Sequence, residues 1–213
     1  LGVKTQVVMG DVGASAEVTA MAGQALAAFG RIDILINNAA IRPSKAFLEM
    51  SDEDWHRVID VDLHSAFYTA RAFGGGMVDK GWGRIINISG GNARNAGNLS
   101  GGARNVSLVY LTKTLAVQMG KFGITVNCIH PGTTRTERTV SLLEARGKAL
   151  GVTPEEAEAL DFADGSSRGN HINRMVDASE IGFLTAYLAS DKSWAVTGEV
   201  IMAGGGSGTA VYY

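Results

Sequence analysis

The chain has 213 residues, of which 46% are hydrophobic and 19% are charged, and its formal net charge is −2 at pH 7. This composition excludes a disordered chain and a strongly basic nucleic-acid-binding surface, and it allows one domain with a sizeable core. No apolar run approaches the roughly 20 residues that cross a bilayer, so we expect neither a membrane nor a nucleic acid as partner. A single cysteine, Cys128, excludes an intrachain disulfide and fits a reducing, cytoplasmic location.

Short runs rich in valine and isoleucine predict strands along the whole chain. They are bounded by glycine, aspartate, asparagine or proline and are continuously apolar, as in strands that are covered on both faces. The predicted strands are residues 5–12, 32–37, 84–89, 124–130 and 199–202.

Segments with helical periodicity separate these strands. The first begins near Ser15 and ends at Gly30, and the second begins at Ser51 with three acidic residues in its first turn. A third has leucines at helical spacing around residues 108–122, and a fourth covers residues 178–189. The alternation of strands and helices predicts βαβ units and a parallel sheet.

The segment from residue 133 to residue 177 is the longest irregular stretch. It contains helix-forming patches at residues 137–150 and 155–159. An insert of this length is more often a substrate loop or lid than a separate domain, so we predict one domain spanning residues 1–213.

The run Phe-Gly-Arg-Ile-Asp-Ile-Leu-Ile-Asn-Asn-Ala-Ala at residues 29–40 resembles the strand-four signature of the short-chain dehydrogenases/reductases, which usually ends Asn-Asn-Ala-Gly. Further segments resemble this family in the same order: residues 11–12, 84–89, 111–116, 124–132 with Thr136, 188–191, 197–198 and 204–205. The resemblance implies an α/β fold with a Rossmann-like doubly wound parallel sheet. It also implies NAD or NADP as cofactor, hydride transfer to or from a small carbonyl or alcohol substrate, and a homo-oligomer, either dimer or tetramer.

The resemblance also implies which residues contact the cofactor: Asp11, Val12, Asn38, Ala39, Ala40, Pro131, Gly132, Thr133 and Thr134. The family begins with a βαβ portion whose glycine-rich turn holds the pyrophosphate. No matching segment occurs here, because Gly74–Gly76 falls inside a helical segment and Gly204–Gly206 follows the last strand. We therefore expect the N-terminal βαβ portion to be absent from these 213 residues, either because a longer protein has been trimmed or because the chain is naturally short. NAD(P) binding is expected only if that portion exists.

Four positions of the family's proton chemistry are changed. In the family a tyrosine exchanges the proton, a lysine lowers its pKa and holds the ribose, a serine binds the carbonyl oxygen, and an asparagine supports a water chain. Aligning residues 111–113 with the family helix assigns these roles to the positions of Gly101, Asn105, Gly90 and Asp62, in that order. Loss of a general acid typically costs roughly 10²–10⁴ in rate, so we expect standard activity to be impaired.

Tyr110 and Lys113 do not replace the missing pair. They lie three residues apart, whereas the family pair lies four apart on one helical face. We interpret Tyr110 as a packing residue and Lys113 as a solvated charge.

Three residues remain as candidates for catalysis: Asp62, Ser89 and Asn105. Asp62 falls on an apolar helical stripe, where a carboxylate needs a partner or a raised pKa. It is either an acid/base or a structural group that caps backbone or pairs with Asn105. Arg104 could receive a carboxylate or phosphate, although we expect it to point outward.

Ser89 lies at the carboxyl end of a predicted strand, where ligands of open α/β sheets bind. We expect His130 to be a hydrogen-bonded loop residue. The other histidines show no ligand spacing with one another or with Cys128, so no metal site is predicted.

Three functions stay open. The first is a divergent NAD(P)-dependent oxidoreductase that takes its proton from water, substrate or Asp62. The second is a lyase, hydratase or isomerase on the same scaffold, with Asp62 as acid/base and Asn105 or Arg104 as anchor. The third is a catalytically silent subunit that binds a ligand or forms a hetero-oligomer with an active paralogue.

Overall fold

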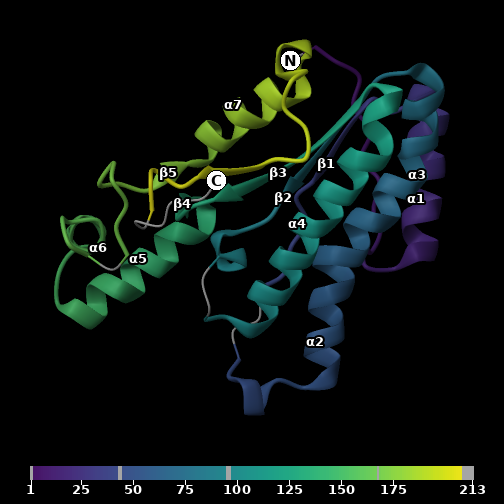
Figure 1. The fold of residues 1–213 in the computed structure, drawn as a ribbon. Helices are drawn as coiled ribbons and strands as arrows, with labels where there is room; N and C mark the ends of the chain where they lie inside the picture. The colour runs from purple at the N-terminus through teal and green to yellow at the C-terminus, as the bar shows by residue number, and fades with distance from the viewer. Residues whose placement is uncertain (1, 43–44, 95–96, 167, 208–213) are drawn as a thin grey trace. The chain divides into compact units, whose positions relative to one another are not determined.

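The computed structural model describes residues 2–42, 45–94, 97–166 and 168–207 (Figure 1). The chain divides into two compact units, the first formed by residues 1–129 and 187–201 and the second by residues 130–186 and 202–213. Each unit is described by itself. The expectation of a single domain with a lid at residues 133–177 stays a prediction.

A four-stranded sheet with the order β1-β2-β3-β6 organises the first unit. The strands are β1 (Ile34–Asn37), β2 (Gly83–Ile88), β3 (Ile124–Pro131) and β6 (Val200–Ala203), and β3 and β6 end in the second unit. β1 pairs with β2, and β2 with β3, in parallel. Four of the five predicted strands and the parallel sheet are confirmed.

The predicted strand at residues 5–12 is wrong. This segment belongs to no strand and ends in a turn at Val12, and the side chains of Val7 and Met9 are 80% and 86% exposed. A strand needs a neighbour that accepts and donates its backbone hydrogen bonds, and none of the described strands lies beside residues 5–12. Local β propensity therefore did not produce a strand here.

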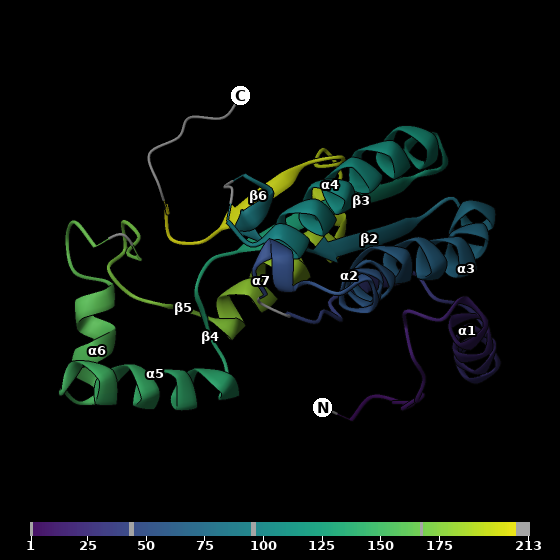
Figure 2. The ribbon, with the colours of Figure 1, turned by 90° about the horizontal axis from the view of Figure 1, so that it is seen from below.

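Helices α3 and α4 pack against one face of the sheet. The helices of this unit are α1 (Ser15–Phe29), α2 (Asp52–Ile59), α3 (Ser65–Lys80) and α4 (Leu99–Met119). Their shared core contains Ala70 and Met77 of α3, Ala116 of α4, and strand residues that include Ile85 and Val126. Figure 2 shows α1 beside α3, away from the strands. The predicted helix starts at Ser15 and Ser51 are confirmed, and the Ser51 side chain accepts from the Asp54 amide at 3.1 Å.

A chain of polar side chains crosses the interior of this layered structure. Thr69 of α3 donates to Asn37 at 2.8 Å, Asn37 donates to Asn87 at 2.9 Å, and Asn87 donates to Thr112 of α4 at 2.9 Å. Each of these groups has a partner, so the polar chain links two helices and two strands without unsatisfied side-chain atoms.

Arg84 at the start of β2 is fully buried. Its guanidinium lies 4.3 Å from the ring centroid of Trp82 and 5.2 Å from that of Trp194. It also donates to the carbonyl oxygens of Gly83 and Ser190, at 2.9 and 3.3 Å. The residue therefore attaches β2 to the segment that follows α7.

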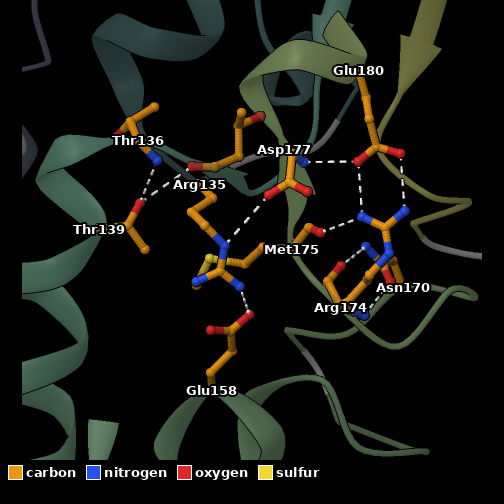
Figure 3. Close-up of polar contacts among 10 residues, drawn as sticks. Arg135, Thr136, Thr139, Glu158, Asn170, Arg174, Met175, Asp177 and Glu180 are labelled. Atoms are coloured by element: carbon orange, nitrogen blue, oxygen red, sulfur yellow. Dashed lines mark hydrogen bonds and ion pairs between the residues drawn. The ribbon is translucent and has the colours of Figure 1, made fainter. Parts of the chain in front are cut away.

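The second unit combines two helices with a pair of short parallel strands. These elements are β4 (Thr134–Arg135), β5 (Val176–Asp177), α5 (Glu137–Leu150) and α6 (Pro154–Asp161), and α7 (Ala178–Ala189) starts here. The helix predictions at 137–150, 155–159 and 178–189 are confirmed. Figure 3 shows Arg135 between Glu158 and Asp177, and Arg174 bound by both oxygens of Glu180.

Candidate active site

Asp62 and Arg104 form a buried ion pair beside the segment that follows β1. Asp62 lies in a π-helical turn, Asp60–His64, between α2 and α3. One carboxylate oxygen accepts from the backbone N–H of Ile41 at 2.9 Å, and the other contacts the Arg104 guanidinium. Arg104 also donates to the Ile41 carbonyl oxygen at 3.0 Å. The π turn, α4 and the backbone at Ile41 are thus joined at one point.

This geometry corrects two expectations. Arg104 points inward, with only 11% of its side chain exposed, because a buried carboxylate and a carbonyl oxygen replace its lost hydration. Burial lowers the pKa of the Arg104 guanidinium, and the positive charge of Arg42 lowers it further. The partner of Asp62 is Arg104 rather than Asn105, although its expected capping of backbone is present.

Asn105 lies next to Gly90, the position that the resemblance assigns to serine. Asn105 is buried, and its side-chain amide donates to the Gly90 carbonyl oxygen at 3.3 Å. Gly101 is buried one turn earlier on α4, on the same helical face. The structure therefore brings together the positions of serine and lysine, and they hold a glycine and a neutral amide.

Ser89 is directed into the protein interior. Its backbone N–H donates to the Ile129 carbonyl oxygen at 2.8 Å, and its buried hydroxyl has no hydrogen-bond partner among the described residues. Burial raises the pKa of the Cys128 thiol to about 11. The nearby side chains of Ser89 and Thr112 act in the opposite direction and lower this pKa. Ser89 shares no hydrogen bond with Asp62 or Asn105 within the described ranges.

Tyr110 and Lys113 lie further along α4. Tyr110 is 75% exposed, and Lys113 Nζ lies 3.8 Å from Glu199 Oε1 at the surface. Tyr110 lines an open apolar groove of about 610 Å³, here called the α4 groove, whose lining residues are Leu63, Val106, Ser107, Tyr110, Leu111 and Thr114. Neither residue contacts Gly90 or Asn105 in the described structure.

The residues expected to contact the cofactor in the first unit lie before α1 and after β1. The Asp11 carboxylate accepts from the Gly13 amide at 2.9 Å and pairs with Arg57 at 2.6 Å, contacts that hold the pKa of this carboxyl below its usual value. Val12 lies in the same turn. Asn38, Ala39 and Ala40 are exposed at the carboxyl end of β1.

The other expected cofactor residues, Pro131 to Thr134, belong to the second unit. The Gly132 amide donates to Ala203 at 3.0 Å, and Thr134 donates to the Gly132 carbonyl oxygen at 2.9 Å. A Cβ on Gly132 would lie 2.5 Å from the Gly204 Cα, so only glycine fits this turn.

His130 is a buried residue of β3 rather than a loop residue. The strand predicted at residues 124–130 already contained this position, and β3 continues one residue further, to Pro131. In the part of the chain that the structure describes, no three histidine, cysteine or acidic side chains gather as metal ligands.

The contact between Arg104 and Asp62 was not foreseen, although a signal for it exists. A carboxylate on an apolar stripe requires a cation, and Arg104 lies on the helix that the resemblance places opposite Asp62. The contribution of the Ile41 backbone carries no such signal, because it depends on the path of the chain after β1.

Comparison with known proteins shows the same relationship over nearly the whole chain. The family model described as Enoyl-(Acyl carrier protein) reductase matches residues 1–207. The chain is 34% identical to the short-chain reductase protein NovJ of Streptomyces niveus, over 92% of this chain and 72% of that protein. It is 32% identical to the 3-oxoacyl-(acyl-carrier-protein) reductase FabG of Escherichia coli (strain K12), over 97% and 79%.

Solved structures agree with this assignment. The L-sorbose reductase of Gluconobacter frateurii, complexed with NADPH and L-sorbose, matches with a TM-score of 0.86 and 25% identity, over 94% of this chain and 75% of that one. The gluconate 5-dehydrogenase of Burkholderia cenocepacia J2315, in complex with NADP and tartrate, gives a TM-score of 0.79 and 28% identity, over 95% and 74%. None of the described helices has the length and hydrophobicity that a bilayer crossing requires. The chain belongs to the short-chain dehydrogenase/reductase family of NAD(P)-dependent oxidoreductases.

Proposed function

We propose that this protein is an NAD(P)-dependent oxidoreductase for a small carbonyl or alcohol substrate, with strongly impaired standard activity. The observation that carries the proposal is the contact between Asn105 and Gly90. Asn105, a neutral amide, occupies the position that the resemblance assigns to lysine. Its side-chain N–H group already donates to the Gly90 carbonyl oxygen. Neither the ammonium of a lysine nor the hydroxyl of a serine is therefore available from these two positions, and Gly101 supplies no phenol at the third.

Two groups of residues, one in each unit, each have features that suit contact with a dinucleotide. Asn38, Ala39 and Ala40 are small and exposed at the carboxyl end of a parallel strand, where open α/β sheets bind ligands. Pro131, Gly132, Thr133 and Thr134 would offer backbone and hydroxyl groups. Bound NAD(P) would supply the hydride donor or acceptor, and two of the matching solved structures were determined with NADPH or NADP.

The chain's own groups would orient the ligand but supply no strong acid. Asn105 would offer an amide for hydrogen bonding without the positive charge that lowers a phenol's pKa. Asp62 is a poor replacement, because its carboxylate is occupied by Arg104 and Ile41. The proton would come from water or substrate, and we expect turnover roughly 10²–10⁴ below that of a relative with the full set.

The test combines cofactor titration with restoration of the catalytic groups. NADH and NADPH are titrated against the purified protein by fluorescence, and a panel of ketones and aldehydes is then assayed for cofactor oxidation. We expect binding with weak turnover, and a gain in turnover in the triple variant G90S/G101Y/N105K. The control Y110F should leave both unchanged.

Two results would contradict the proposal. Absence of NAD(P) binding would remove the cofactor and favour the silent subunit, whereas rapid turnover by the unaltered protein would remove the impairment. The non-redox alternative requires a free carboxylate at Asp62, and its pairing with Arg104 gives that alternative no support.

We also propose a homo-oligomer, formed in part through the α4 groove. Val106, Tyr110 and Val117 are exposed apolar or aromatic residues of α4 at or near this groove. Exposed apolar surface of this kind favours a protein partner, and α4 of a second copy would match it. Sedimentation analysis of V106D is the test, because the proposal expects a shift toward monomer while S107A keeps the assembly. The single buried thiol of Cys128 fits the cytoplasmic location proposed for this oligomer.

A further inference from the structure

Two arginines, Arg104 and Arg42, lie at the segment that follows β1, beside the candidate active site. Arg104 and Asp62 form the buried pair described above, and Arg42 directly follows Ile41, whose carbonyl oxygen accepts from Arg104 at 3.0 Å. Arg42 is exposed and forms no hydrogen bond or ion pair with any described residue. These three side chains carry a net charge of +1.

Lys45, the next cation along the chain after Arg42, has its own partner. Lys45 pairs with Asp54 at 2.5 Å, and Asp54 also accepts from the Ser51 hydroxyl at 2.7 Å. The positive charge of Arg42 reaches Arg104, because it contributes to the lowered pKa of that guanidinium. Arg104 is paired with Asp62, and Arg42 forms no ion pair with a described acid.

Arg104 also has an unused donor. Its Nε atom is fully buried and has no hydrogen-bond partner among the described residues, although Nη1 binds both Asp62 and Ile41. A buried N–H group without an acceptor is costly, and native proteins rarely leave one unpaired. An acceptor oxygen from outside the described chain would satisfy it.

We infer that Arg42 and Arg104 form a binding site for the oxyanion group, carboxylate or phosphate, of a small ligand. Guanidinium groups suit this class because their planar N–H donors match the oxygens of carboxylates and phosphates. Arg104 precedes Asn105 on α4, so the anionic group would be held next to the position that the resemblance assigns to the reaction centre. The inference rests on the proposed function in taking this region as the substrate pocket.

Direct binding measurements test the site without cofactor or turnover. Malonate, inorganic phosphate and the neutral analogue malonamide are titrated into the purified protein by calorimetry at low ionic strength, where surface charges are least screened. We expect saturable binding of malonate or phosphate and none of malonamide. The tighter of the two anions identifies the carboxylate or the phosphate as the preferred group.

Two variants locate the site. R42Q removes an exposed charge and should weaken anion binding roughly tenfold, the scale of one charge-assisted contact. The matched control R31Q also removes an exposed guanidinium, one that pairs with Asp33, and should bind as the unaltered protein does. Equal affinity of R42Q and the unaltered protein, equal binding of malonamide, or no binding of either anion would overturn the inference. Because no NAD(P) is present, failure here leaves the oxidoreductase proposal standing, and failure of cofactor binding leaves this result intact.

Discussion

The side-chain amide of Asn105 lies 3.3 Å from the Gly90 carbonyl oxygen, and a Cβ on Gly90 would lie 3.0 Å from the same amide nitrogen. The two positions are therefore coupled, since a side chain at residue 90 forces Asn105 to move. Overpacking of this kind costs about 1–3 kcal/mol, and we expect G90A to lower the free energy of unfolding by an amount in that range.

The coupling is measured with a double-mutant cycle. In the N105A background the amide is absent, so the added cost of G90A should become smaller by about 1 kcal/mol or more. Urea denaturation of the four proteins gives the coupling energy. Additive effects of the two substitutions would show that Asn105 and Gly90 do not compete for space.

Breaking the pair between Asp62 and Arg104 should destabilise the protein strongly. D62N leaves a buried guanidinium without its counter-charge, and the loss of one partner of a buried pair typically costs about 3–5 kcal/mol. The control D33N removes a carboxylate that pairs with Arg31 and Lys80 at the surface, where we expect about 0–1 kcal/mol. If the cost comes from the uncompensated charge, the free energy of unfolding should fall less in the double variant D62L/R104M than in D62N.

Arg84 should be replaceable by neither lysine nor methionine without loss. Its guanidinium lies against two indole rings and binds two carbonyl oxygens, and a lysine ammonium cannot make these planar contacts. Burial lowers the pKa of this guanidinium, and Asp191 opposes that change. We expect R84K and R84M each to cost about 1–3 kcal/mol in thermal unfolding, whereas K113M, at an exposed position, should be nearly neutral. Loss of the guanidinium from both indole rings should also change the near-ultraviolet circular dichroism of the tryptophans in R84M. An unchanged spectrum would contradict the contact between Arg84 and these rings.

The pair of Glu180 and Arg174 should make the second unit acid-sensitive. The hydrogen bond and charge of Arg174, together with the Asp177 amide, lower the pKa of Glu180 from its ordinary value of 4.5 to about 2. Because the folded pKa is depressed, the stabilisation is complete above about pH 4.5 and is lost as the pH falls toward 2. In E180Q the temperature of the unfolding midpoint should decrease less between pH 4.5 and pH 2 than it does in the unaltered protein. E137Q, at a glutamate without an ion pair among the described residues, serves as control, and equal acid sensitivity of both variants would contradict the prediction.

The sequence predicted the fold well where local and tertiary signals agree. Helix α5, Glu137–Leu150, has the bounds of the helix-forming patch predicted at residues 137–150, and Gly151 ends it in a left-handed conformation. The segment at residues 5–12 shows the opposite case, since its β propensity has no neighbouring strand to satisfy. Whether a strand forms depends on the rest of the sheet, and no local pattern contains that information.

For the site, the sequence predicts changed catalytic positions, which stays a prediction, and it predicts only some of the contacts of these residues. The neutral groups at Gly90, Gly101 and Asn105 follow directly from the alignment of α4 with the family helix. The inward direction of the Arg104 side chain does not follow from that alignment. An arginine next to a buried face points inward only when a specific acceptor is within reach. Here the acceptors are a carboxylate from a π turn and a main-chain oxygen, and both depend on the folded chain.

The amide contact between Asn37 and Asn87 has a consequence for how the sheet assembles. These residues stand opposite each other in the pairing of β1 with β2, and each also binds a threonine on a different helix. If β1 slid by one residue so that Ile36 stood opposite Asn87, the Asn87 side-chain oxygen would lose the Asn37 amide and the Thr69 hydroxyl would lose its acceptor on Asn37. Polar groups thus determine the register between the apolar strands β1 and β2. A shifted register would lose hydrogen bonds once the helices pack on the sheet.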